Sequence, residues 1–162
     1  MMITEDAHEF FDAIPRFGAL LGLDLGTKTI GVALSDTVQL VASAHHTVKR
    51  RKFTQDAQEL VSLARAREIK GVVLGLPRNM DGSEGPRAQS ARAFARNLAT
   101  PLPLPVLLWD ERLSTVAAER ALLEADTSRK RRAEVIDAVA AGYILQGALD
   151  RMRHIKGSMD DG

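Results

Sequence analysis

The sequence has no cysteine, and it has no run of apolar residues long enough to cross a membrane. The first absence excludes disulfides and thiolate metal sites, and it fits a reducing cytoplasm. No signal-peptide pattern opens the chain, so we expect a cytoplasmic protein with no membrane partner. A strong net charge is also missing, because 22 Lys and Arg against 21 Asp and Glu leave +1. Any nucleic-acid-binding surface must therefore come from local clusters of charge.

What is present suffices for one globular domain, since 45% of the 162 residues are hydrophobic. We expect the domain to span residues 18–152, preceded by an N-terminal extension (1–17) that is a tail or a short helix. Residues 153–162 look like a flexible C-terminal tail. Two basic clusters, at residues 49–52 and 129–132, are either nucleic-acid contacts or solvated loops.

The rest of the chain is organised around residues 20–36. Apolar residues alternate there on both sides of a Gly-Thr-Lys turn, which predicts a β-hairpin. The other face of the first strand carries Gly22, Asp24 and Gly26, so one carboxylate stands on a face with room for a backbone, a metal ion or a phosphate. Burying it is costly unless it is paired or bound to a cation. The alternative is a strand-end aspartate that accepts hydrogen bonds from the turn amides.

Further along, predicted strands and helices alternate. We expect a third strand at 38–48, a helix at 53–68, a buried strand at 71–77, a helix starting near Pro86, a strand at 106–109, and helices at 114–124 and 133–152. This order predicts the α/β class, with a five-stranded mixed sheet and helices on both faces. Right-handed crossovers make the strands at 71–77 and 106–109 parallel to the first strand. Their carboxyl ends then share one edge of the sheet.

Acidic residues gather at that edge. Asp24 lies in the first strand, Asp110 and Glu111 end the last one, and Asp137 lies among small residues of the final helix. Clustered carboxylates persist where a hard cation neutralises them, and oxygen-only ligands favour Mg²⁺ or Mn²⁺ over Zn²⁺. Two such ions would activate a water and stabilise the leaving oxygen of a phosphodiester. The alternatives are a salt bridge to Arg112 at the strand end, and a surface acid near a helix N-terminus for Asp137.

The chain resembles the YqgF family in four segments, which follow in order: LGLDLGTKTIGVALSD, GLPRNMDGSEGPRA, WDERLST and VIDAVAAGYILQ. The resemblance covers residues 18–150. These are bacterial pre-16S rRNA nucleases, also described as Holliday-junction-resolvase-like, with the ribonuclease H fold. The resemblance implies a metal-dependent endonuclease that hydrolyses RNA phosphodiesters at the 5′ end of pre-16S rRNA during ribosome biogenesis.

By motif, the resemblance assigns the catalytic and metal-binding roles to Asp24, Glu111 and Asp137. Asp110 belongs to the same motif as Glu111, and strand parity cannot choose between them. The implied substrate contacts are Lys28, Asn79, Asp81, Gly82, Ser83, Arg87 and Arg112. We expect Ser83 and Arg87 to hold one phosphate at a helix start, whereas Asp81 could equally make the turn. The implied cofactor is Mg²⁺ or Mn²⁺, and the partner is an rRNA precursor or branched DNA.

Three other functions remain open at this stage. Residues 24–27, Asp-Leu-Gly-Thr, are similar to the phosphate loop of sugar kinases and actin-like ATPases, but those proteins clamp a nucleotide between two domains and this chain has length for one. A junction resolvase would use the same metal chemistry on branched DNA, and a binding factor for ribosome assembly would use the fold without catalysis. The sequence separates neither RNA from DNA nor one oligomeric state from another.

Overall fold

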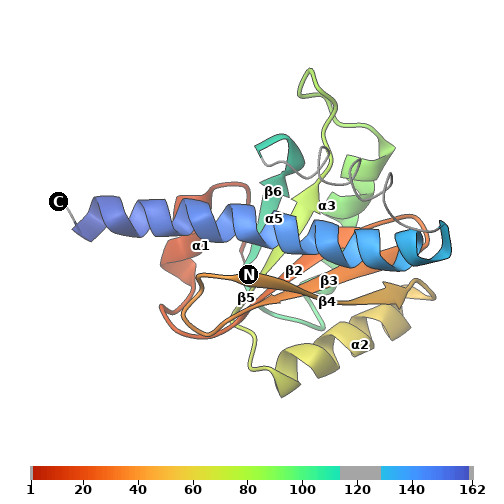
Figure 1. Ribbon diagram of the computed structural model, residues 1–162, viewed down its shortest axis with the longest axis horizontal. Coiled ribbons are helices and arrows are strands. Elements are labelled where there is room, and N and C mark those ends of the chain that lie inside the picture. Colours follow the sequence, from red (N-terminus) through yellow and green to blue (C-terminus); the bar gives the residue numbers. More distant parts are fainter. Residues whose placement is uncertain (1, 114–128, 161–162) are drawn as a thin grey trace.

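The fold is built on a six-stranded mixed sheet with the order β1-β6-β5-β2-β3-β4 (Figure 1). The computed structural model describes the backbone of residues 2–113 and 129–160, and the side chains of 2–113 and 136–158. The strands are β1 (Ile3–Thr4), β2 (Leu20–Leu25), β3 (Thr29–Ser35), β4 (Ala42–Lys49), β5 (Gly71–Leu76) and β6 (Val106–Asp110). Strands β1, β6, β5 and β2 are parallel, while β3 pairs antiparallel with both of its neighbours.

The mixed sheet and the shared edge are confirmed, but the predicted number of five strands is wrong. The additional strand is β1, in which Ile3 and Thr4 pair with Val106 and Leu107 at the edge of the sheet. Two residues are too few to show an alternating pattern, so this strand could not be predicted from the sequence.

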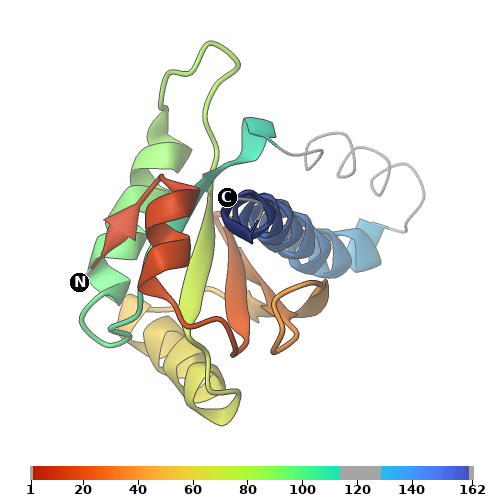
Figure 2. The same ribbon diagram turned by 90° about the vertical axis from the view of Figure 1, so that its left-hand side faces the viewer.

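Helices cover both faces of the sheet (Figures 1 and 2). One face packs against α2 (Phe53–Ala66) and α3 (Pro86–Leu98), and the other against α1 (Ala7–Ala13) and α5 (Arg129–Asp160). A short 3-10 helix, η1 (Glu111–Leu113), follows β6. The expected helix at 114–124 lies outside the described residues. The basic cluster at 129–132, expected in a loop, lies in the first turns of α5.

The two faces of β2 differ as the alternation predicted. Leu21, Leu23 and Leu25 join the core under α2 and α3. Gly22 lies on the other face, where a methyl group on its Cα would come within 2.7 Å of the Leu145 Cβ in α5. The nearly bare face therefore makes room for a helix backbone.

The buried face of α5 differs in part from the expected one. The expected stripe contained Ile136, Val139, Ala140, Tyr143, Ile144 and Gly147, whereas the buried residues between 136 and 149 are Ile136, Ala138, Ala140, Ala141, Ile144, Leu145, Ala148 and Leu149. Val139, Tyr143 and Gly147 are half-buried. The glycines of the sheet bring the helix so close that adjacent residues, such as Ile144 and Leu145, both contact it. No helix in the described ranges is long and apolar enough to span a membrane.

Both ends of the chain take part in the packing. Phe10 and Phe11 of α1 are buried in the same cluster as Met152 and Ile155 of α5. This contact explains why α5 continues to Asp160 rather than ending near Met152, so the expected loss of helix after residue 152 is wrong. The division into an extension, a domain and a tail stays a prediction.

Candidate active site

A row of four residues crosses the sheet near the carboxyl ends of its parallel strands. Asp24 pairs with Gly31 of β3, and Gly75 of β5 pairs with Trp109 of β6. Gly75 also follows Leu74, the β5 partner of Leu23, so it stands beside Asp24. The Asp24 carboxylate, in a residue only 2% exposed, therefore has a glycine on each side.

The other two acids of the predicted set reach the edge at these two glycines. A methyl group on Gly75 would lie 2.9 Å from the Glu111 Oε1, and one on Gly31 would lie 1.8 Å from the Asp137 carbonyl oxygen. Neighbouring residues of paired strands are about 5 Å apart, so both acids approach the strand position next to Asp24. The Thr29 hydroxyl donates a hydrogen bond to Oδ2 of Asp137. The structure thus brings Asp24, Glu111 and Asp137 to one edge.

The donor chemistry of these acids fits a hard divalent cation, because all three supply carboxylate oxygens. In this structure, however, the three side chains do not form a complete metal-binding site. Across the described residues, no three His, Cys, Asp or Glu side chains are grouped closely enough to hold a metal ion. The three acids therefore approach the same edge of the sheet from β2, η1 and α5, but their carboxylates are not grouped around a single metal position.

The Asp110 carboxylate forms ion pairs with arginines instead of facing the other acids. Arg112 holds its carboxylate with a 2.7 Å contact from Nη2 and a 2.9 Å hydrogen bond from the backbone N–H, and Arg78 Nη1 lies 3.4 Å away. The Arg112 hydrogen bonds hold the pKa of Asp110 below its usual value. The salt-bridge alternative therefore describes Asp110, while the Glu111 carboxylate lies on the α5 side of the sheet.

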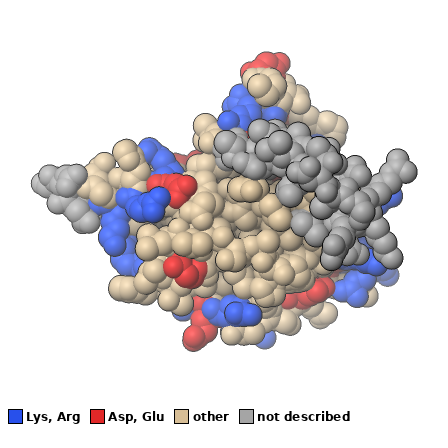
Figure 3. Space-filling view, viewed as in Figure 1, with Lys and Arg blue, Asp and Glu red and all other residues tan. Residues whose placement is uncertain are grey.

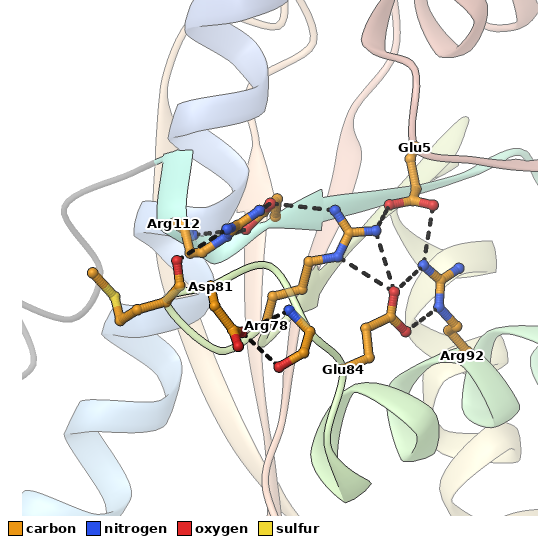
Figure 4. A network of polar contacts seen from close by, with 9 residues as sticks. Glu5, Arg78, Asp81, Glu84, Arg92 and Arg112 are labelled. Carbon is orange, nitrogen blue, oxygen red and sulfur yellow. Dashed lines mark hydrogen bonds and ion pairs between the residues drawn. The ribbon is translucent and has the colours of Figure 1, made fainter.

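The ion pairs continue into a network that the sequence did not predict (Figure 4). Arg92 of α3 contacts Glu84 at 2.6 Å and Glu5 at 3.0 Å, and Arg78 pairs with the same two carboxylates. Hydrogen bonding from Arg92 lowers the pKa of Glu84 to about 2. The network joins the N-terminal segment, the loop at 77–85, α3 and the end of β6. Glu5 gave no signal in the sequence, because its partners lie 73 and 87 residues away.

The loop between β5 and α3 projects from the body, and Met80 near its tip is 91% exposed (Figure 1). Its polar residues bond one another. Asp81 Oδ1 accepts hydrogen bonds from the backbone N–H and the hydroxyl of Ser83, and Asn79 Nδ2 donates to the same hydroxyl at 2.9 Å. Ser83 hydrogen bonding lowers the pKa of Asp81. Gly82 has φ +90°, which favours glycine, and Arg112 packs against it. The turn-making alternative for Asp81 is thus the one seen.

Arg87 points toward β2 instead of the loop. Its Nη2 lies 3.5 Å from the Leu25 carbonyl oxygen, and Arg50 Nη1 donates to the Gly26 carbonyl at 2.7 Å. Both arginines line one small cavity. Lys28 is nearby and exposed, and its carbonyl accepts the Arg50 backbone N–H at 2.9 Å. Arg50 was expected only as a member of a basic cluster.

Comparison with known proteins finds similar sequences along most of the chain. The RuvX family, described as Holliday junction resolvase, matches residues 18–151. A protein of Paracoccus denitrificans (strain Pd 1222), named "Putative pre-16S rRNA nuclease", is 69% identical over 154 residues, covering 95% of this chain and 98% of its own. A protein of Cereibacter sphaeroides (strain ATCC 17029 / ATH 2.4.9) with the same name is 70% identical over 151 residues, covering 93% of this chain and 94% of its own.

A solved structure shares the fold at low identity. Thermus thermophilus RuvC in complex with Holliday junction substrate has a TM-score of 0.53 and 14% identity, covering 83% of this chain and 96% of that one. The ribonuclease H-like fold class is thereby confirmed, with six strands. The family match and the identities extend over most of the sequence, and they confirm the resemblance drawn from the four motifs. The chain therefore belongs to the RuvX family, known also as YqgF.

Proposed function

We propose that this protein is a metal-dependent endonuclease that hydrolyses RNA phosphodiesters, and that it processes the 5′ end of pre-16S rRNA in the cytoplasm. The observation that carries the proposal is the row Gly31–Asp24–Gly75, which holds one buried carboxylate where two other acids arrive. The names of the relatives in Paracoccus and Cereibacter support the substrate.

In this proposal Asp24, Glu111 and Asp137 hold Mg²⁺ or Mn²⁺. The ion, when bound, polarises the phosphate and lowers the pKa of a water. The protein supplies the placement. Asp24 is fixed in the middle of the sheet, and the Thr29 hydroxyl orients Asp137. Asp24 from β2, Glu111 from η1 and Asp137 from α5 would supply the carboxylate oxygens that hold the ion.

The nucleic acid is proposed to lie along the carboxyl edge of the sheet rather than across α5. Residues 138–149 of α5 carry no charged side chain, and the middle of this face in Figure 3 is correspondingly poor in charge. The edge offers the exposed residues Lys28, Arg50 and Arg87, and the loop tip at 79–83 projects above it. Arg112, bound to Asp110 and packed on Gly82, positions that loop.

The family description favours a second candidate function, resolution of branched DNA. The same acids would serve either substrate, so only a direct comparison separates them. Purified protein with Mg²⁺, with Mn²⁺ and with EDTA would be offered a pre-16S rRNA 5′ segment, a four-way DNA junction and an unrelated single-stranded RNA. The proposal predicts metal-dependent cleavage of the pre-rRNA at a defined site. Preferred cleavage of the junction, or cutting that EDTA does not stop, would overturn it.

A further inference from the structure

We propose that Arg50 and Arg87 together bind one backbone phosphate of the nucleic-acid substrate, close to the phosphate that is cleaved at Asp24. The inference rests on the proposed nuclease function and adds a defined phosphate site to it. Arg50 directly follows β4, Arg87 lies in the first turn of α3, and both line a cavity at the end of β2.

The two guanidinium groups converge on consecutive carbonyl groups. Arg50 Nη1 lies 2.7 Å from the Gly26 oxygen, and Arg87 Nη2 lies 3.5 Å from the Leu25 oxygen. A carbonyl orients the guanidinium but does not neutralise it. Each group retains donors for a second partner, because a guanidinium has five N–H bonds.

Neither arginine has an acidic partner in the described part of the chain, whereas neighbouring arginines do. Arg51, the next residue after Arg50, pairs with Glu59 at 3.3 Å. Arg92, on the same helix as Arg87, contacts Glu84 at 2.6 Å. Both side chains are exposed, and two positive charges that face one cavity without an acidic partner give it a positive potential that attracts an anion. The cavity is therefore a place where an anionic group of the substrate would be favoured.

The cavity suits a phosphate in size and in donors. It has a volume of about 140 Å³ and is lined by Leu25, Gly26, Thr27, Arg50, Pro86, Arg87 and Ser90. The hydroxyls of Thr27 and Ser90 add neutral hydrogen-bond donors to the two guanidinium groups. Arginine forks match phosphate oxygens in a bidentate manner, which gives shorter and stronger hydrogen bonds than neutral donors.

The position of the cavity relates it to the scissile phosphate. Gly26 is two residues beyond Asp24, which corresponds to about 7 Å along an extended chain. A strand of duplex nucleic acid carries one phosphate for about every 3.4 Å of helix axis. The phosphate held by Arg50 and Arg87 would therefore lie within about two nucleotides of the cleaved bond, and it would fix the register of the substrate.

Equilibrium binding of the pre-rRNA segment tests this site without requiring cleavage. The measurements use full-length Asp24→Asn protein carrying Arg50→Gln, Arg87→Gln or both, over a range of salt concentrations. The matched control is Arg51→Gln, which removes the same charge one residue away from the site. We expect each single change to weaken affinity about tenfold, because charged hydrogen bonds to phosphate are lost. The control should weaken affinity less than twofold.

The double variant distinguishes one shared phosphate from two separate ones. If both arginines bind one phosphate, their effects are not additive, and the slope of log K against log salt falls by about 0.7, the value for one contact on a single strand. If the two losses of affinity add up and the slope falls by about 1.4, the arginines bind two different phosphates, and the shared site would be overturned. An equal loss in Arg51→Gln would reduce the effect to general charge and would also overturn it.

Neutral methylphosphonates, placed one at a time near the cleaved bond, locate the phosphate. One position should weaken binding to the parent protein, and the same position should have no effect on the double variant. If inorganic phosphate binds with the same arginine dependence while RNA affinity does not change, the site serves a free anion and the assignment to the backbone is wrong. Failure of the wild type to cut any substrate would instead overturn the proposed nuclease function, which these affinities do not measure.

Discussion

Replacing Gly31 by alanine is expected to push α5 away from the sheet and to disturb the acid set. The new methyl group would lie 1.8 Å from the Asp137 carbonyl oxygen and 2.2 Å from its carbon. Real contacts of this kind essentially never fall below 3.0 Å, so the helix backbone must retreat by at least about 1.2 Å. Overpacking of this size costs about 1–3 kcal/mol in the free energy of unfolding. A shift of about 1 Å at catalytic groups can cost a hundredfold in rate.

Two measurements test this reasoning. Thermal unfolding should show a melting temperature lower by about 2–10 °C for Gly31→Ala, and single-turnover cleavage should slow about a hundredfold at temperatures where the variant is still folded. Gly157→Ala is the matched control, because it adds a methyl group to α5 with nothing within 4 Å. It should leave cleavage unchanged and stabilise the helix by up to about 1 kcal/mol. A Gly31→Ala protein as stable and active as wild type would refute the proposed approach of α5.

Three more outcomes are expected from the geometry. Glu111→Gln should abolish cleavage with the melting temperature retained, whereas Asp110→Asn should lower the melting temperature and keep most of the activity; the reverse pattern would exchange their roles. Glu84 has its pKa lowered from 4.5 to about 2 by Arg92, so its contribution to stability is complete above about pH 4.5 and is lost as the pH falls through 2. Acid unfolding followed by circular dichroism should therefore be flatter in Glu84→Gln over that range, and an unchanged curve would contradict the pairing. Thr29→Val removes a hydroxyl that orients the carboxylate of α5, so kcat should fall about tenfold while RNA affinity stays the same, and a loss of affinity instead would argue against an orienting role.

Local patterns in the sequence were enough to predict most of the sheet. The alternation in 20–36 predicted the hairpin and also the face on which Asp24 stands, because side chains of a strand alternate with a period of two. The apolar segment at 71–77 predicted the buried parallel strand β5. Crossover handedness then placed the strand ends at one edge, where Asp24 and Glu111 are found.

What the sequence could not predict depends on contacts between distant residues. Strand β1 is too short for a pattern, and α5 is extended by packing on Phe10 and Phe11, which have no regular spacing. Parity could not separate Asp110 from Glu111, since both faces of the sheet are covered. The neighbouring Gly75, which makes room for the Glu111 carboxylate, distinguishes them only once the strands are paired.

The loop residues show the same limit. The sequence predicts that Ser83 and Arg87 hold one phosphate together at the start of a helix. In the structure Ser83 bonds Asp81 within the turn, and Arg87 extends toward Leu25 together with Arg50. The partner of Arg87 lies in a strand 62 residues earlier in the chain. No local pattern contains that information.

The central claim, that Asp24 is the essential carboxylate of a nuclease, is tested most directly by Asp24→Asn. The substitution removes one ligand charge and almost no volume, so the melting temperature and the affinity for the pre-rRNA segment should change little. Cleavage of that segment with Mg²⁺ should fall at least about a hundredfold in single-turnover experiments. Asp12→Asn, on the exposed side of α1 where Asp12 contacts His8, should cut like wild type. An Asp24→Asn protein that cleaves at the wild-type rate would contradict the account at its centre.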